Sequence, residues 1–175
     1  MRSSKIGITL GIILLLAVVA RADRVTADRD HAVNFSEYKT FMWIQKPKSK
    51  EPFMADRIVA AVNAQLRLKG FREVNEEADM AVGANLATEE QHEWETYYDG
   101  SGWGWGWDGG GWATTKVKTY EVGTITVDLF DARGKKLMWQ GVATDEVSSR
   151  PQKRTRETDK QIEKMFKKFP LGPQE

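Results

Sequence analysis

The alternation of hydrophobic and polar residues is clearest between residues 124 and 143, where it predicts a two-stranded antiparallel ribbon. One set of alternating positions holds Ile125, Val127 and Leu129 in the first strand, and Leu137, Trp139, Gly141 and Ala143 in the second. A type I turn at Ala132–Arg133, closed by a left-handed Gly134, would join them through a bulge. That register pairs Leu129 with Leu137 and Val127 with Trp139, and it buries the whole set on one face.

Periodicity along the rest of the chain predicts further strands and two amphipathic helices. Alternation with branched and aromatic residues indicates strands at 25–28, 40–44, 71–74, 79–98 and 114–122. Three- and four-residue spacing predicts helices at 54–69 and 155–169, the first ended by Gly70 and the second by Pro170. Most connections suit antiparallel pairing. The expected fold is therefore α+β, with an antiparallel sheet of five to six strands and two helices packed on one face.

The first 22 residues are expected to lie outside this fold. Arg2 and Lys5 precede an apolar run of 15 residues, Ile6–Ala20, and Ala20-Arg21-Ala22 offers the small residues that signal peptidase recognises. This pattern predicts a cleaved signal peptide at 1–22 and a single domain at 23–175. An uncleaved N-terminal anchor is the alternative, although the run is shorter than the ~20 residues of a spanning helix.

Composition narrows the function classes. The chain has 26 basic and 25 acidic residues, and loss of residues 1–22 would leave 23 basic ones, a net charge of −2. A general nucleic-acid binder would be strongly basic, so no nucleic-acid partner is expected. The chain has no cysteine, which excludes a zinc–thiolate site, a thiol nucleophile and a lipid anchor on cysteine. An exported domain without disulfides is typical of the bacterial periplasm or cell envelope.

The most biased stretch is a Gly/Trp-rich loop at 99–113, which holds four of the seven tryptophans. In an extended backbone Trp103, Trp105 and Trp107 would project from one side, ~7 Å apart. We predict that these three and Trp112 form a binding site. A row of indoles suits sugar rings, a neutral lipid interface or a groove on an envelope protein. The structural alternative is a loop that folds against its own domain or a passive low-complexity tract. The loop should join strands 80–98 and 114–127 and lie away from the helices.

An acidic cluster at 89–99 adjoins this loop and contains one of the two histidines. A divalent cation bound by Glu90, His92, Glu93 and Glu95 is one interpretation, and a solvated strand end is the favoured one. The sequence contains neither an H-E-x-x-H nor a G-x-S-x-G motif, and the glycines at 104–109 lack the strand–helix context of a dinucleotide site. We therefore expect no cofactor and no catalysis. A metal-dependent hydrolase or metal-binding protein that uses this cluster is the alternative.

The order and spacing of several short motifs resembles the bacterial family called domain of unknown function 4136. The motifs are Phe35-Ser36-x-Tyr38-Lys39-Thr40-Phe41-x-Trp43, Asp56-Arg57-Ile58, Lys69-Gly70-Phe71, Ala78-Asp79, Gly123-Thr124-Ile125-x-Val127-Asp128, Trp139-x-Gly141 and Phe169-Pro170. The resemblance implies an exported protein, often a lipoprotein, without an established activity. This chain departs from the lipoprotein pattern because it lacks the cysteine. The sequence therefore predicts a non-catalytic envelope protein of unknown biochemical function that binds or scaffolds through the Gly/Trp-rich loop.

Overall fold

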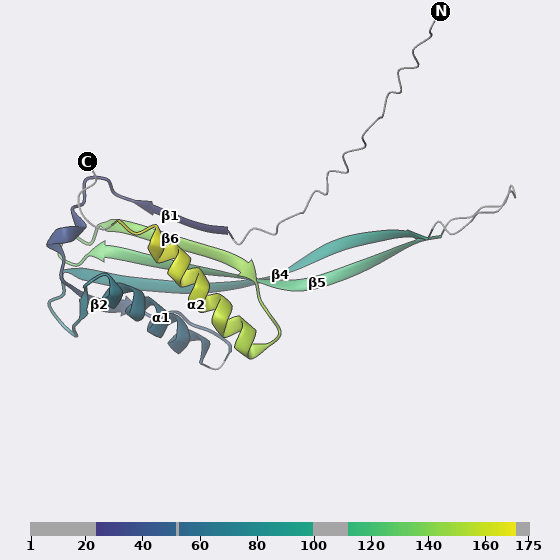
Figure 1. The fold of residues 1–175 in the computed structure, drawn as a ribbon, viewed down its shortest axis with the longest axis horizontal. Helices are drawn as coiled ribbons and strands as arrows, with labels where there is room; N and C mark the ends of the chain where they lie inside the picture. Colours follow the sequence, from purple (N-terminus) through teal and green to yellow (C-terminus); the bar gives the residue numbers. More distant parts are fainter. Residues whose placement is uncertain (1–23, 52, 100–111, 171–175) are drawn as a thin grey trace, which may run out of the picture.

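The computed structural model describes residues 24–51, 53–99 and 112–170, and side chains in all of these except 96–99 and 112–114. The predicted signal peptide and the stretch from 100 to 111, with Trp103, Trp105 and Trp107, lie outside the described residues. In chain order the elements are β1 (Arg24–Arg29), the 3-10 turn η1 (Phe35–Glu37), β2 (Thr40–Gln45), α1 (Met54–Leu68), β3 (Arg72–Glu73), β4 (Met80–Asp99), β5 (Trp112–Asp131), β6 (Leu137–Glu146) and α2 (Pro151–Lys167) (Figure 1).

These strands form a sheet of six in the order β1-β6-β5-β4-β2-β3. The pairs β1–β6, β6–β5 and β5–β4 are antiparallel, whereas β2 lies parallel to both β3 and β4. The parallel pairs arise because α1 returns the chain to the end of the sheet at which β2 began. Both helices lie on the same face of the sheet (Figure 1). The α+β class is confirmed, with a sheet that is mostly but not wholly antiparallel.

The core lies between the two helices and the sheet. Each helix buries one stripe at three- and four-residue spacing, as the sequence predicts. The buried helical and adjoining side chains are Met54, Ile58, Val62, Leu66, Ile162, Met165, Phe166 and Phe169. Aromatic rings gather at one end of this layer, where the ring centroid of Phe169 lies 4.8 Å from that of Phe35 and 5.5 Å from that of Trp139. Trp139 itself is 1 % exposed, so it is a core residue.

The hairpin of β5 and β6 forms, but its register differs from the predicted one. Trp139 pairs with Leu129, and Val127 pairs with Gly141. The next residue of β5, Phe130, pairs with Leu137, so Met138 is an extra residue in β6 at this point. Met138 is buried, whereas Leu137 is 41 % exposed. The prediction that Leu137 would be buried opposite Leu129 was therefore wrong.

The turn between these strands explains the difference. The carboxylate of Asp131 accepts hydrogen bonds from the backbone N–H groups of Arg133 (2.8 Å) and Gly134 (3.0 Å). These bonds extend the helical part of the turn, so that Lys135 rather than Gly134 takes the left-handed conformation, with φ 54°. The turn is one residue longer than predicted, and the irregularity at Met138 adds a second residue, so β6 is shifted by two residues relative to β5.

Gly141 allows α2 to approach the sheet. A Cβ atom added at this position would lie 2.2 Å from Cγ of Met165 and 2.5 Å from Cη2 of Trp139. The backbone of Gly141 therefore occupies the gap that these two side chains leave, and no larger residue fits without displacing α2 or the indole.

Gly141→Ala should lower the free energy of unfolding by about 1–3 kcal/mol, because overpacking forces side chains out of their rotamers. Urea unfolding measured by circular dichroism checks this. Gly134→Ala is the matched control, since its added Cβ would meet nothing closer than 3.6 Å. Equal stability of the two variants would contradict the close approach.

Asp79 joins the start of β2 to the start of β4. Its carboxylate accepts hydrogen bonds from the backbone N–H of Lys39 (2.8 Å) and from the N–H and hydroxyl of Thr40 (both 2.9 Å). Its own carbonyl accepts the N–H of Ala132 from the β5–β6 turn at 3.0 Å. The N–H of Lys39, followed by the Thr40 hydroxyl, lowers the pKa of Asp79 against the opposing effect of desolvation.

This depressed pKa sets the direction of a pH effect. The folded protein binds the Asp79 proton less tightly than the unfolded chain, so the stabilisation is present above the unfolded pKa, near pH 4, and is lost as pH falls toward the folded pKa. Asp79→Asn should be less stable than wild type at pH 7, on the order of 1 kcal/mol. That difference should shrink as the pH falls below about 4 in a series of urea titrations. A difference that stays constant with pH would exclude this role of the carboxylate.

Candidate functional site

β4 and β5 continue well past the rest of the sheet. They stay paired from Met80 opposite Asp131 to Asp99 opposite Trp112, whereas β2 follows β4 only to Gly83 and β6 follows β5 only from Val122 inward. The outer part, residues 90–99 and 112–121, is a two-stranded ribbon that extends away from both helices (Figure 1). We call this ribbon the arm. Its position agrees with the long hairpin predicted on either side of the Gly/Trp-rich loop.

The two faces of the arm differ in chemistry. One face continues the alternating positions that are buried at Val82 and Ala84, and it carries Trp94 directly opposite Val117. These two side chains are 71 % and 49 % exposed. The other face carries opposite charges across the strands, with Glu93 opposite Lys118 and Glu95 opposite Lys116. Such cross-strand pairs support the ribbon, whereas the exposed indole and valine do not contribute to any core.

The predicted metal-binding residues are divided between these faces. Glu90 and His92 share the face of Trp94, and Glu93 and Glu95 lie on the opposite one, because side chains alternate along a strand. Nδ1 of His92 lies 3.0 Å from the hydroxyl oxygen of Thr119. Among residues 24–51, 53–99 and 112–170, no three His, Asp or Glu side chains are placed to hold a metal ion. Of the predicted binding residues, only the backbone of Trp112 is described, paired with Asp99.

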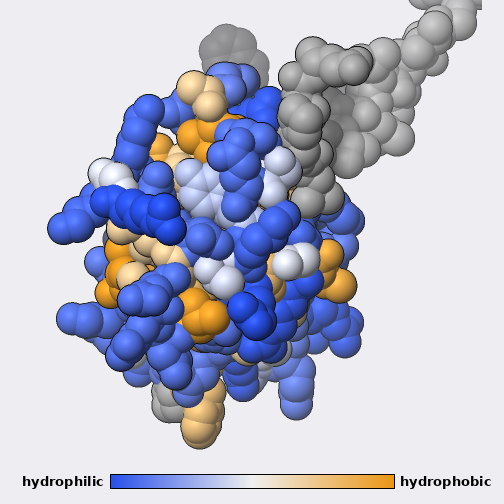
Figure 2. Space-filling model, turned by 90° about the vertical axis from the view of Figure 1, so that its left-hand side faces the viewer, coloured by the Kyte–Doolittle hydropathy of each residue, from blue (hydrophilic) through white to orange (hydrophobic). Residues whose placement is uncertain are grey.

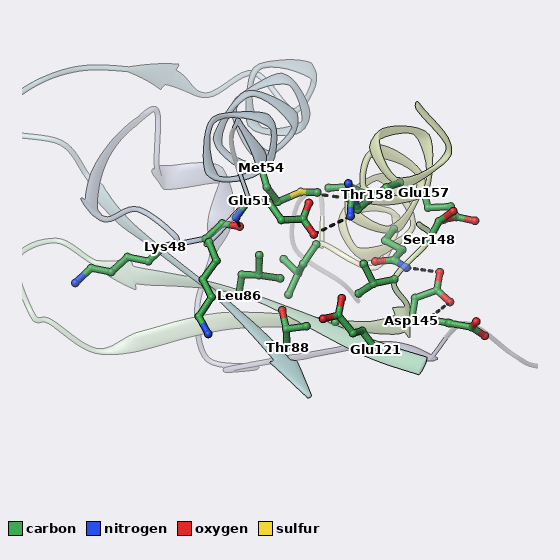
Figure 3. A pocket seen from close by; sticks show the side chains of 18 of the residues that line it. Lys48, Glu51, Met54, Leu86, Thr88, Glu121, Asp145, Ser148, Glu157 and Thr158 are labelled. Carbon is green, nitrogen blue, oxygen red and sulfur yellow. Dashed lines mark hydrogen bonds and ion pairs between the residues drawn. The ribbon is translucent and has the colours of Figure 1, made fainter. Parts of the chain in front are cut away.

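A cavity of about 630 Å³ lies at the root of the arm, between the sheet and the N-terminal ends of α1 and α2 (Figure 3). Its apolar lining comes from Met54, Leu86, Ile125 and Val147. Leu86 and Ile125 occupy the same set of alternating positions as Trp94 and Val117. The floor of the cavity is therefore continuous with the face of the arm that carries Trp94 and Val117, and Glu90 and His92 lie between them. Its volume is within the range of pockets that hold small ligands or an anchoring side chain, roughly 300–1,000 Å³.

The rim of this cavity is mostly acidic. Its charged residues are Glu51, Glu90, Glu121, Asp145, Glu146 and Glu157 against Lys48, Lys50 and Arg154. Glu90 lies directly opposite Glu121, and like charges in that position destabilise a strand pair. Nε2 of Gln161 donates to the carboxylate of Asp145 at 2.5 Å. The rim therefore favours a cationic partner.

Arg154 and Glu51 connect α2 to the segment before α1. Nη1 of Arg154 donates to Oε1 of Glu51 at 2.7 Å, and the two side chains are 21 % and 35 % exposed. Nε of Arg154 is buried without a partner among the described residues. Losing Glu51 would leave most of this guanidinium unpaired.

The sequence does not reveal the cavity, because five stretches of the chain, around residues 50, 88, 123, 146 and 157, form it together. One signal was present on α2, where Thr158 and Gln161 interrupt the inward stripe and are both 6 % exposed. The hydroxyl of Thr158 donates weakly to Sδ of Met54 at 3.9 Å. Polar residues at inward positions of an amphipathic helix indicate an unfilled or polar space beneath them.

No helix within the described part of the chain is both long enough and apolar enough to span a membrane.

Comparisons with known proteins identify similar sequences and folds. The family model described as Domain of unknown function (DUF4136) matches residues 25–171. No curated protein matches the chain. The structure of a DUF4136 family protein from Bacteroides thetaiotaomicron is 19 % identical, with a TM-score of 0.52, over 87 % of this chain and 98 % of that one.

Two further structures share this fold. The PelC dodecamer from Paraburkholderia phytofirmans is 16 % identical, with a TM-score of 0.54, over 88 % of this chain and 100 % of that chain. A PDZ domain protein from Parabacteroides distasonis is 11 % identical, with a TM-score of 0.55, over 85 % of this chain and 35 % of that one. At these identities the likeness is one of fold.

Glu51→Ala should lower the free energy of unfolding by about 1–2 kcal/mol, because Arg154 would lose its partner in a half-buried site. Glu163→Ala is the matched control. It breaks an exposed pair with Lys167, whose side chain is 69 % exposed, and should leave the denaturation midpoint unchanged. Equal effects in urea unfolding would show that the Glu51–Arg154 pair does not join the helices.

Proposed function

The chain belongs to the DUF4136 family, a domain of unknown function, and we propose that it is an exported cell-envelope protein that binds or scaffolds without catalysis. In this proposal the arm and the Gly/Trp-rich segment beyond it make the contact. The arm supports the proposal most directly, because it is an ordered ribbon whose described side chains add nothing to the core. Exposed strand edges are normally kept short or covered, so a ribbon of this length favours a use for its surface.

The exposed residues of the arm favour a binding role. Trp94 is 71 % exposed and faces Val117 across the ribbon, and tryptophan is among the residues that contribute most to interfaces. The sequence beyond the arm adds Trp103, Trp105 and Trp107. Indoles separated by glycine suit the apolar faces of sugar rings, a neutral lipid interface or a groove on a protein.

Charge restricts these targets. The arm contains Glu90, Glu93, Glu95, Asp99 and Glu121 against Lys116 and Lys118. An anionic membrane surface would repel it. Neutral glycans, neutral lipid interfaces and protein grooves are compatible with its charge.

Export is supported by the N-terminal sequence. The basic residues at 2 and 5, the apolar run and the small residues at 20 and 22 form a signal-peptide pattern. The absence of cysteine rules out an anchor on that residue. Association with the envelope would then depend on binding by the folded domain.

Replacing Gly100–Gly111 by the two-residue turn Asn-Gly should leave the melting temperature nearly unchanged, since loop length alters closure entropy only slightly. The same change should abolish retention of the purified protein on envelope fractions. A full-length variant with Trp103, Trp105 and Trp107 replaced by Ser is the control that separates the indoles from loop length, and it should also lose retention. Unfolding of the shortened protein, or full retention of either variant, would refute the proposal.

A further inference from the structure

The cavity and the face of the arm that carries Trp94 and Val117 form one continuous surface, which no other described part of the chain covers. Thr88, Glu90, His92 and Trp94 follow one another at alternate positions of β4, from the cavity outward. We call this surface, from the cavity to Trp94 and Val117, the seat. It is apolar at both ends, and its cavity rim carries six carboxylates against three basic groups. A fitting partner must therefore bring an apolar side chain flanked by cations.

The end of the domain away from the cavity carries an exposed apolar side chain flanked by basic residues. α1 begins at Met54, which lines the cavity, and ends at Leu68 on the far side of the domain (Figure 1). Leu68 is 79 % exposed, the highest value among the large hydrophobic residues described. Arg67 and Lys69 flank it. We call Arg67, Leu68 and Lys69 the plug.

The plug is held in a fixed position. Nη2 of Arg67 donates to the Glu73 carboxylate at 2.9 Å, and that carboxylate also accepts Nδ2 of Asn63 at 3.0 Å. Oδ1 of Asn63 in turn accepts the indole N–H of Trp43 at 2.8 Å. The end of α1 is thereby tied to β2 and β3, and an interaction through Leu68 would need little further ordering.

Charge at this end complements the rim of the seat. The residues that form it, 29–39, 67–79, 131–136 and 163–170, include 11 basic and 8 acidic side chains. Two of the acidic ones, Asp79 and Asp131, are engaged by backbone N–H groups. Figure 2 views this end and shows hydrophobic surface among predominantly hydrophilic side chains. A net positive end opposite a net negative one favours association of copies end to end.

The electrostatic dipoles of the helices also favour an arrangement in which the plug of one copy faces the seat of another. Both helices begin at the cavity, and neither N-cap residue, Phe53 or Arg150, caps its helix with a side chain. The carbonyl end of α1 lies at the plug. Docking a plug into a seat would place the negative end of one helix near the positive ends of two others. Phe53, the residue before Met54, is 71 % exposed and lies in the left-handed region with φ 64°, a conformation that bulky residues rarely adopt.

We propose that copies of this chain associate head to tail, with the plug of one copy bound in the seat of the next. The contact is heterologous, because each copy contributes a different surface, and it therefore builds a ring or an open chain rather than a twofold dimer. The arm of one copy would lie along the next and cover Trp94 and Val117. This proposal assigns Trp94 and Val117 to the contact between copies, whereas the Gly/Trp-rich segment remains the proposed site for another partner.

Sedimentation velocity over a concentration series tests the proposal, with protein purified from cells that express the full chain. Wild type should associate with increasing concentration, and less so at high salt. Leu68→Glu in the plug and Glu90→Lys with Glu121→Lys in the seat should each weaken association at least about tenfold. Ile44→Glu is the matched control, since Ile44 is also exposed, at 57 %, but belongs to neither surface. Circular-dichroism melts establish that each variant is folded.

Mixing the two defective variants gives the sharper result. The plug variant keeps an intact seat and the seat variant keeps an intact plug, so an equal mixture should form dimers that cannot extend. Monomeric wild type, unchanged association of Leu68→Glu, or a mixture that stays monomeric would each overturn the proposal. If copies associated through the N-terminal segment instead, the plug and seat variants would associate as strongly as wild type, and this result would also overturn the proposal. The variant with a shortened Gly/Trp-rich segment should associate like wild type, which separates this proposal from the proposed binding role.

Discussion

The absence of a side chain at Gly141 is the constraint on which the arrangement of this domain depends. Met165 and the indole of Trp139 both lie within 2.5 Å of the point where a Cβ would be. This close contact fixes α2 over β6 and brings Phe166 and Phe169 to the aromatic cluster. Once α2 is fixed, its first turns complete the cavity beside α1. The geometry of the candidate site thus follows from packing at a distance from it.

Much of the fold could be predicted because it is encoded by local patterns. Alternation located β4 and β5, three- and four-residue spacing located both helices, and Gly70 does take a left-handed conformation with φ 91°. The register of the β5–β6 hairpin could not be predicted, because the side chain of Asp131 selects a longer turn than the glycine suggests. The parallel pairing of β2 with β4 is equally invisible to periodicity, since a strand's pattern does not name its neighbour.

The candidate site was predicted less completely, for a physical reason. The long hairpin was foreseen from its two strands, and the residues at 100–111 lie outside the described structure. The cavity depends on segments around residues 50, 88, 123, 146 and 157, which only the tertiary fold brings together. The division of the acidic cluster at 89–99 could be predicted, because alternation along a strand sends Glu90 and His92 to one face and Glu93 and Glu95 to the other.

The arm also has a geometrical consequence for how proteins of this architecture can diverge. Because it is supported by its own ladder, its reach can change without disturbing the core. Adding two residues to each strand would lengthen it by about 7 Å and keep every side chain on its present face. Adding one residue to each strand would exchange the faces, so that beyond the insertion the indole would project where the glutamates are now. Length is therefore free to vary in steps of two, whereas single steps would invert the chemistry of the surface.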